Sequence, residues 1–295
     1  MSGADDETQP AELIERLVRL LDVETLDSDL FRGPLTHEPW QRVFGGQVVA
    51  QALMAACRTV PAERPPHSLH AYFMRPGDPG LPIIYQVFRD RDGGRFSSRR
   101  VVALQNGRPI LNLAASFHEP EPGLAHQSAM PDVPPPEALR SEREVVADMI
   151  EQFPEWRRPM MLIPRALEFR PVAPGLRYAQ IPREAMQYYW FRAAAPLPND
   201  ALLHRVLLAY ASDMMLISTS LLPHHIAWNM DQVQEASLDH AIWLHGDVRL
   251  DEWLLYAQDS PWAGQGRGMN RGLIFTRDGR LVASVAQEGL IRVRE

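Results

Sequence analysis

The apolar positions along the chain follow two kinds of spacing, in an order that occurs twice. Residues 11–21 carry apolar side chains at helical spacing, and residues 43–60 form a longer, mostly apolar run that predicts a buried helix. Four runs rich in strand-forming residues follow, separated by Gly, Pro or Asn-Gly, and begin at residues 67, 82, 95 and 109. This pattern predicts an antiparallel sheet packed on one long helix, because a sheet must bury one of its faces.

A linker separates this first part of the chain from a second one. Residues 119–136 contain seven prolines or glycines with almost no periodicity, and residues 137–153 have the pattern of a short linker helix. We therefore expect an N-terminal domain over residues 1–118, a linker with a helix over 119–160, and a C-terminal domain over 161–295.

The second part repeats the order of the first. Strand patterns surround a long apolar helix, predicted over residues 202–219. At an offset of 172 residues, Gly94-Arg95, Arg99 and Gly107-Arg108 recur as Gly266-Arg267, Arg271 and Gly279-Arg280. At an offset of 169 residues, Ser68-Leu69 recurs as Ser237-Leu238. Because the matches keep their order, we interpret the chain as two copies of one α+β unit.

Composition narrows the classes of protein. A chain of 295 residues with 45% hydrophobic content can bury substantial cores, and its net charge of -7 argues against a general nucleic-acid or membrane-surface binder. No uninterrupted apolar run approaches the ~18 residues of a membrane span. The single cysteine, Cys57, is expected to be a small buried apolar residue. The acidic start has no signal-peptide pattern, and the C-terminus is not a Ser-Lys-Leu peroxisomal address, so we expect a cytoplasmic location.

One carboxylate falls inside the apolar helix predicted for the second part. Asp213 follows Leu-Leu-Ala-Tyr-Ala-Ser and precedes two methionines. A buried, unpaired carboxylate is strongly unfavourable, so Asp213 requires a partner, such as an arginine or a backbone amide, or a function. The matching helix of the first part has no acidic residue. The two copies therefore differ where a catalytic acid or base could lie.

Polar residues on the predicted strands add further candidates. Gln287 corresponds to Ala115 at the offset of 172, so it also distinguishes the two copies, although a glutamine in an alternating strand can simply face solvent. Ser237 opens a strand, where serine is often a turn or cap residue, and Asp239 and His240 follow it. A single histidine is often structural.

Several familiar catalytic motifs do not occur in the sequence. It contains no G-x-S-x-G nucleophile elbow, Walker loop, dinucleotide fingerprint or H-E-x-x-H motif. His224 and His225 are adjacent, whereas a helical pair of metal ligands needs i, i+4 spacing. We therefore predict no metal site.

The longer motifs, taken in order, resemble the acyl-CoA thioesterase II family of double-hotdog proteins. They lie at residues 31–34, 43–53, 67–79, 207–213, 237–245, 251–256 and 277–289. Together they cover nearly the whole chain except the acidic start and the linker, which makes the match more specific than one short signature. The resemblance implies an α+β double hotdog, in which two tandem antiparallel sheets, each wrapped around a long central helix, form one continuous sheet.

The resemblance also implies hydrolysis of fatty acyl-CoA thioesters by direct attack of water. The water ligands of the family are an aspartate, a serine or threonine, and a glutamine, which correspond here to Asp213, Ser237 and Gln287. Asp213 fits the role of base, and the other two could orient the water by hydrogen bonds. Coenzyme A is part of the substrate, so no cofactor is expected. Hotdog proteins generally associate, which implies a homodimer or larger homo-oligomer.

The oxyanion of such a reaction needs hydrogen-bond donors. The start of the first buried helix supplies candidates, the backbone amides near Gly45, Gly46 and Gln47, because helix N-termini favour negative charge. His70 is a further candidate.

The two ends of an acyl-CoA suggest other residues. Arg267 and Arg271 are candidates for binding the phosphates of coenzyme A. Met214, Met215 and Leu216, next to Asp213, could line an apolar tunnel for the acyl chain, although core packing is the commoner role of such residues.

Two alternatives stay open at this point. A hotdog enoyl-CoA hydratase would share the fold and the ligand, and could use Asp239 together with His240. A catalytically silent acyl-CoA-binding sensor would keep the fold without the chemistry. The occurrence of all three polar candidates in only one copy favours an enzyme.

Overall fold

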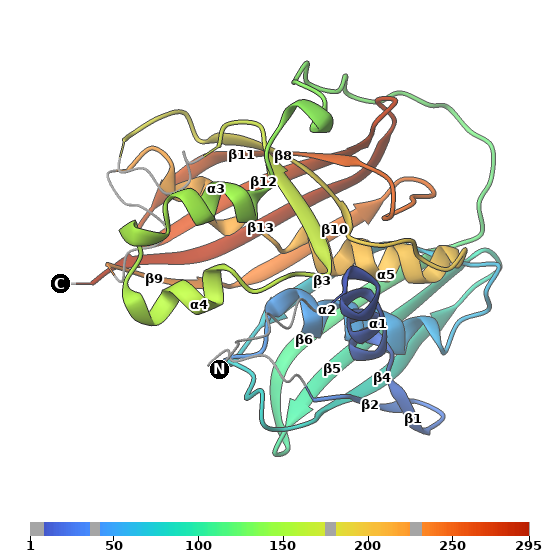
Figure 1. Ribbon diagram of the computed structural model, residues 1–295. Helices are drawn as coiled ribbons and strands as arrows, with labels where there is room; N and C mark the ends of the chain where they lie inside the picture. The colour runs from blue at the N-terminus through green and yellow to red at the C-terminus, as the bar shows by residue number, and fades with distance from the viewer. Residues whose placement is uncertain (1–8, 36–41, 175–180, 225–231, 295) are drawn as a thin grey trace.

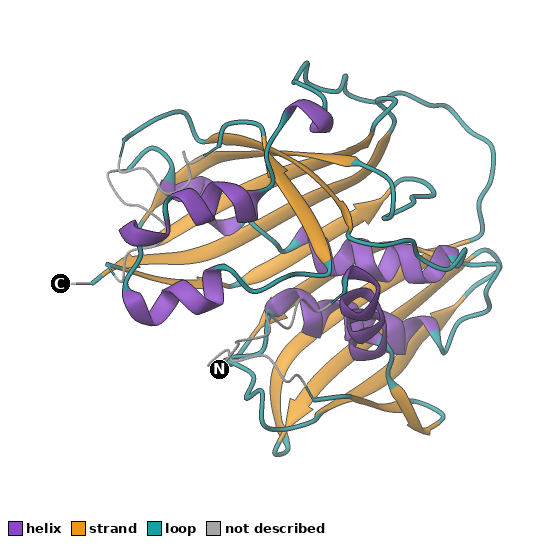
Figure 2. Ribbon diagram, in the orientation of Figure 1, coloured by secondary structure: helices purple, strands orange, loops and turns teal. Residues whose placement is uncertain are grey.

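The strands of both parts of the chain join into a single antiparallel sheet. The computed structural model describes residues 9–35, 42–174, 181–224 and 232–294. In these residues the sheet has 13 strands. All except β9 follow the order β1-β2-β4-β5-β6-β3-β10-β13-β12-β11-β8-β7, and β9 pairs with β13 off this path (Figures 1 and 2). The predicted α+β architecture with one continuous sheet is confirmed.

The first half of the sheet follows the elements expected from the sequence. The helices are α1 (Pro10–Leu21) and α2 (Gly45–Cys57), and the main strands are β3 (Pro66–Phe73), β4 (Ile83–Asp92), β5 (Phe96–Gln105) and β6 (Arg108–His118). Between β5 and β6, Asn106 and Gly107 have φ of 49° and 70°, as the Asn-Gly pair predicts for a two-residue hairpin turn. The short strands β1 (Glu24–Asp27) and β2 (Leu30–Gly33) were not expected, because four residues are too few to show alternation.

The second half repeats this arrangement around a second helix, α5 (Ala201–Ser212), which a 3₁₀ turn, η5 (Ile217–Leu221), follows. The strands are β7 (Leu167–Pro171), β8 (Met186–Ala193), β9 (Val233–Ser237), β10 (Asp239–Leu244), β11 (Leu254–Gly264), β12 (Arg267–Thr276) and β13 (Leu281–Val293).

The two halves meet where β3 pairs with β10, with His240 opposite Ala71 and Ile242 opposite Leu69. On the inner face of the sheet, α2 and α5 pack against each other, and α1 contacts both helices (Figure 1). All three helices contribute to one hydrophobic core that includes strands of both halves.

The predicted linker crosses the outer face of the second half. Its Met130, Val133 and Leu139 pack on a cluster that contains Trp190 and Trp253. The single helix expected over 137–153 is divided into shorter pieces: η1 (Pro136–Ala138), α3 (Glu142–Asp148) and η2 (Ile150–Gln152), followed by η3 (Glu155–Arg157) and α4 (Arg158–Met161). The linker therefore covers apolar sheet surface that would otherwise face solvent.

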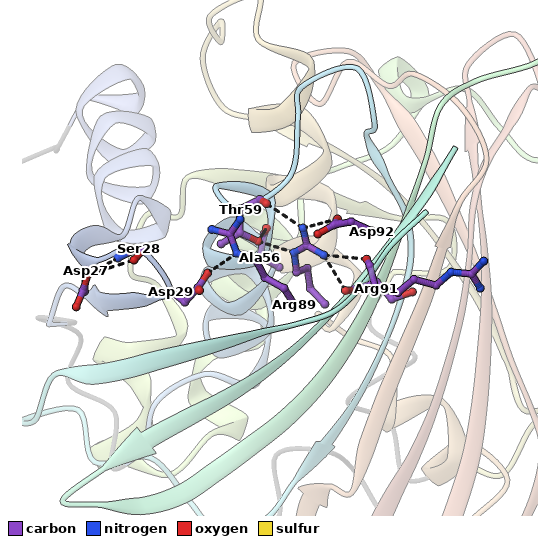
Figure 3. Close-up of polar contacts among 10 residues, drawn as sticks. Asp27, Ser28, Asp29, Ala56, Thr59, Arg89, Arg91 and Asp92 are labelled. Carbon is purple, nitrogen blue, oxygen red and sulfur yellow. Dashed lines mark hydrogen bonds and ion pairs between the residues drawn. The ribbon is translucent and has the colours of Figure 1, made fainter. Parts of the chain in front are cut away.

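A buried arginine forms hydrogen bonds with the residues that follow the carboxyl end of α2. The side chain of Arg99 is 1% exposed and donates to Thr59 Oγ1 and to the Thr59 carbonyl oxygen, at 2.8 and 3.0 Å. It also donates to the Arg91 carbonyl oxygen and the Asp92 carboxylate, and these acceptors lie together just beyond the end of the helix (Figure 3). Arg271, which the repeat offset aligns with Arg99, lies on the surface and pairs with Asp259. Asn270, opposite Gln287, takes the buried position that Arg99 occupies opposite Ala115.

The apolar segment Ala201–Leu221 is long enough to cross a membrane by length and composition alone. It consists of α5, η5 and the residues between them, and 72% of its most apolar window is buried within the protein. Leu203, Val206, Leu207, Leu208 and Leu216 belong to the main hydrophobic core. We therefore interpret this segment as a core helix and its continuation.

Candidate active site

The helix predicted over 202–219 ends earlier, at Ser212, and Asp213 is its C-terminal cap. Met215 then has a φ of 66°, a left-handed conformation that non-glycine residues seldom adopt and that ends the helix. Side chains from the sheet donate hydrogen bonds to carbonyl oxygens at this early helix end. Tyr256 Oη donates to the Ser212 carbonyl oxygen at 2.6 Å, and Gln187 Nε2 donates to the Met215 carbonyl oxygen at 3.0 Å. Asp213 is therefore placed at the end of a buried helix instead of in its middle.

Three of the candidate residues meet at this helix end. Gln287 Nε2, from β13, donates to Asp213 Oδ1 at 2.5 Å and to Ser237 Oγ, at the end of β9, at 3.2 Å. Gln287 is fully buried, Asp213 is 7% exposed, and Ser237 is half-buried. Gln287 lies 74 positions from Asp213 and 50 from Ser237 in the sequence, yet the three side chains form one hydrogen-bonded and largely buried cluster.

The amino end of α2 lies against the same carboxylate. A Cβ atom placed on Gly45 would be 2.8 Å from Asp213 Oδ2 and 3.0 Å from Phe73 Cζ. A Cβ atom on Gly46 would be 2.5 Å from the Tyr210 carbonyl oxygen in α5. Only glycines allow this close approach of the two helices. The first N–H groups of a helix have no acceptor within it, so the end of α2 brings hydrogen-bond donors and positive potential to Asp213.

A fourth polar side chain joins the cluster. His240 in β10 is completely buried, its Nδ1 lies 3.2 Å from Gln287 Nε2 and 3.8 Å from Asp213 Oδ1, and its Nε2 lies 2.8 Å from Ser212 Oγ. Burial lowers the pKa of His240, against the weaker opposing effects of Asp213 and then Asp239, which favours the neutral ring.

The sequence alone suggests His240 either as a structural histidine or as a partner of Asp239, its neighbour in the chain. Successive side chains on a strand point to opposite faces, and Asp239 Oδ1 accepts instead from the Glu288 backbone amide at 2.6 Å. The sequence does show that His240 follows Ser237 by three residues, but not that its ring lies beside Gln287.

The remaining candidates lie in different surroundings. His70 is exposed on the opposite face of the sheet and packs edge-on against Trp243 at 4.9 Å, so it is not brought to Asp213. Arg267 forms an ion pair with Glu288 at 2.9 Å, and Arg271 forms one with Asp259 at 2.5 Å that raises its pKa. Both arginines are thus engaged with carboxylates on the outer surface.

The residues next to Asp213 contribute mainly to packing. Met215 and Leu216 are buried in the main hydrophobic core, and Met214, half-buried, packs against it. Among the described residues, no group of three or more His, Cys, Asp or Glu side chains could hold a metal ion; His225 lies outside them. Cys57 is buried, and its burial raises the pKa of its thiol, so it has little thiolate character.

Comparisons with known proteins agree along the chain. A family model described as acyl-CoA thioesterase matches residues 178–290, and one described as the acyl-CoA thioesterase N-terminal domain matches residues 36–118. Human acyl-coenzyme A thioesterase 8 is 43% identical over 296 residues, which cover 97% of this chain and 92% of the human protein. The chain belongs to the acyl-CoA thioesterase II family. The resemblance seen in the sequence motifs is confirmed.

Solved structures support the membership and the fold. An acyl-CoA thioesterase II from Mycobacterium marinum aligns with a TM-score of 0.78 at 41% identity, over 95% of this chain and 99% of that one. A hotdog-fold protein of unknown function from Alicyclobacillus acidocaldarius aligns with a TM-score of 0.75 at 19% identity, over 95% and 99% of the two chains, and shows the fold alone. This acyl-CoA thioesterase is therefore a thioester hydrolase with a double-hotdog architecture.

Proposed function

We propose that this thioesterase hydrolyses fatty acyl-CoA by direct attack of a water molecule held by Asp213, Ser237 and Gln287. The observation that carries the proposal is the convergence of these three side chains, from α5, β9 and β13, at the amino end of α2. A base, two orienting groups and a set of oxyanion donors are the components that thioester hydrolysis needs.

In the proposed reaction, Asp213 takes a proton from the water while the water oxygen attacks the thioester carbonyl carbon. The negative charge that develops on the carbonyl oxygen is stabilised by backbone N–H groups of Gly45 or Gly46. The third candidate, the N–H of Gln47, already donates to the Phe44 carbonyl oxygen at 3.1 Å. The intermediate then breaks its C–S bond, and the proton on Asp213 passes to the leaving thiolate of coenzyme A. Asp213 returns to the carboxylate, and the products are a fatty acid and coenzyme A.

The cluster is suited to orient Asp213 before the water reacts. The amide of Gln287 donates to the carboxylate, and the positive end of α2 lies beside its other oxygen. Ser237 is less buried than its partners, so it borders the side from which a substrate would approach. Preorganised donors of this kind require little rearrangement during the reaction.

The roles proposed for the two ends of the substrate require the side chains concerned to rearrange. To bind phosphates of coenzyme A, Arg267 and Arg271 would have to exchange their carboxylate partners, Glu288 and Asp259, for the ligand. The Arg271–Asp259 pair is exposed and the Arg267–Glu288 pair is partly exposed. Surface ion pairs are worth only about 0–1 kcal/mol, so such an exchange is energetically feasible. An acyl tunnel along Met214, Met215 and Leu216 would require these packed side chains to move apart.

The test is release of coenzyme A thiol from a short, a medium and a long acyl-CoA, with Asp213→Asn beside the wild type. The substitution keeps the size of the side chain but removes the base, so we expect kcat to fall by roughly 10²- to 10⁴-fold with every substrate. Asp239→Asn is the matched control, because it makes the same chemical change on the other face of the sheet, and it should keep wild-type rates.

Equal rates for the wild type and Asp213→Asn would reject the proposed base while leaving the family activity intact. Turnover of crotonyl-CoA without thiol release would instead support an enoyl-CoA hydratase.

A further inference from the structure

A hydrogen-bonded chain connects the end of α5 to the amide of Gln287 through His240. Ser212 Oγ donates to the Ala209 carbonyl oxygen at 2.9 Å, and the same oxygen lies 2.8 Å from His240 Nε2. On its other side, His240 Nδ1 lies 3.2 Å from Gln287 Nε2.

The direction of this chain follows from the number of protons available. A serine hydroxyl has one hydrogen, which Ser212 gives to Ala209, so Ser212 Oγ must accept from His240 Nε2–H. In the neutral ring, Nδ1 is then an acceptor, and the group that it faces, Gln287 Nε2, is a donor. The amide has two hydrogens, so one goes to Asp213 Oδ1 at 2.5 Å and the other is shared between His240 Nδ1 and Ser237 Oγ, both at 3.2 Å. Burial of His240 disfavours the charged ring that would carry a proton on both nitrogens.

The opposite arrangement is unfavourable. If Nδ1 carried the proton, Gln287 would have to turn its amide oxygen toward the ring. That oxygen would also face Asp213 Oδ1, which now accepts from Gln287 Nε2, and two acceptors would be in contact in a buried site. The tautomer of His240 and the orientation of the Gln287 amide are therefore coupled.

The first half of the sheet shows that packing alone does not require a histidine here. On β3 and β6, every buried side chain is apolar, including those of Leu69, Ala71, Leu113 and Ala115. Ala71 lies directly opposite His240. On β10 and β13, buried polar side chains occur at His240 and Gln287. The polar pair is thus confined to the half that contains Asp213.

We propose that His240 is a positioning residue for thioester hydrolysis, whose Nδ1 accepts from Gln287 and holds the amide nitrogen toward Asp213 and Ser237. The inference rests on the proposed function, since it assigns a role relative to Asp213 and Gln287. His240 touches neither substrate nor water in this account and takes no proton. Its contribution is to exclude the flipped amide, which would direct an oxygen at the catalytic carboxylate.

Two substitutions separate this role from a purely structural one. In His240→Asn, the amide oxygen can take the place of Nδ1 and keep the acceptor for Gln287. In His240→Gln, the longer side chain can reach Ser212 but provides no acceptor at the Nδ1 position. We expect His240→Asn to keep kcat within about 5-fold and His240→Gln to lower it roughly 10- to 100-fold, with KM nearly unchanged, because small misplacements of reacting groups cost about that much.

A second measurement uses the wild-type protein and does not depend on how the variants fold. Nitrogen chemical shifts of ¹⁵N-histidine-labelled enzyme, with the His240 signals assigned through His240→Asn, report which ring nitrogen carries the proton. We expect the Nε2–H tautomer at pH 7. A proton on Nδ1, or a doubly protonated ring, would overturn the proposal.

The kcat values of the two His240 variants also distinguish the possible roles of this residue. Equal losses in both variants that follow a common fall in melting temperature would mean a structural role, and wild-type kcat in both would mean no role; either outcome overturns the proposal. Asp213→Asn is measured in the same assay. If it remains active, the proposed function itself has failed, whereas an inactive Asp213→Asn with a fully active His240→Gln rejects only the role of His240.

Discussion

Gly45→Ala tests the contact between α2 and Asp213 on which the oxyanion assignment depends. The added methyl carbon would lie 2.8 Å from Asp213 Oδ2 and 3.0 and 3.2 Å from two carbons of the Phe73 ring. A carbon–oxygen contact needs roughly half an ångström more, so the carboxylate or the helix must move by about that distance. Movement on this scale would weaken the hydrogen bond between Gln287 Nε2 and Asp213 Oδ1.

The expected effects on activity and on stability have different origins. Alanine favours a helix over glycine by up to about 1 kcal/mol, which offsets part of the strain, so we expect the melting temperature to change little. A shift of the catalytic carboxylate should lower kcat by roughly 10- to 100-fold. The assay is thiol release from acyl-CoA with separate kcat and KM, together with thermal unfolding followed by circular dichroism.

Gly94→Ala is the matched control, because a Cβ atom there meets nothing within 4 Å. It should keep wild-type kcat. A wild-type kcat in Gly45→Ala would refute the reasoning, since it would mean that the close approach of α2 to Asp213 has no bearing on the reaction. A fall in kcat that only matches a large loss of folded protein would also count against it.

Further predictions concern the hydroxyl, the buried arginine and the histidines. Ser237→Thr keeps the hydroxyl and should retain kcat within a few-fold, whereas Ser237→Ala should lower it about 10-fold or more in the thiol-release assay; equal rates in both would remove Ser237 from the site. Arg99→Met leaves the acceptors beyond α2 unpaired and should lower the free energy of unfolding by about 2–4 kcal/mol in urea titrations, with KM unchanged; unaltered stability would contradict its capping role. Burial also lowers the pKa of four histidines in the folded state, so the unfolded chain binds more protons once the pH falls below their usual value of about 6.5. The free energy of unfolding should therefore be higher at pH 7.5 than at pH 5.5. A higher free energy of unfolding at pH 5.5 would contradict the lowered pKa of these histidines. These histidines are His67, His204, His240 and His245.

Local patterns were enough to predict most elements of the fold. The strand pattern and the Asn106–Gly107 turn depend on residues close in sequence, and the structure confirms both. The end of α5 depends on distant partners, because Tyr256 and Gln187 hold the carbonyl oxygens that a longer helix would have used. The apolar pattern continues past Asp213 for a different reason, namely that the following residues are also buried.

Some residues of the candidate site could be predicted from the sequence, and others depend on distant partners. The differences between the two copies pointed to Asp213 and Gln287, and the structure brings them together with Ser237. The position of His240 could not be foreseen, because its partners lie on α5 and β13 and its sequence neighbour Asp239 faces the other way. The domain boundaries, the cytoplasmic location and the homo-oligomeric state stay predictions.

Direct attack by a water held by Asp213 can be distinguished from an acyl-enzyme route by a single turnover in ¹⁸O-labelled water with enzyme in excess over acyl-CoA. If water attacks directly, thiol and fatty acid appear at the same rate, every fatty acid molecule carries one labelled oxygen, and the mass of the quenched enzyme is unchanged. Release of thiol before the acid, with an acyl group found on Asp213 or Ser237, would contradict direct attack by water.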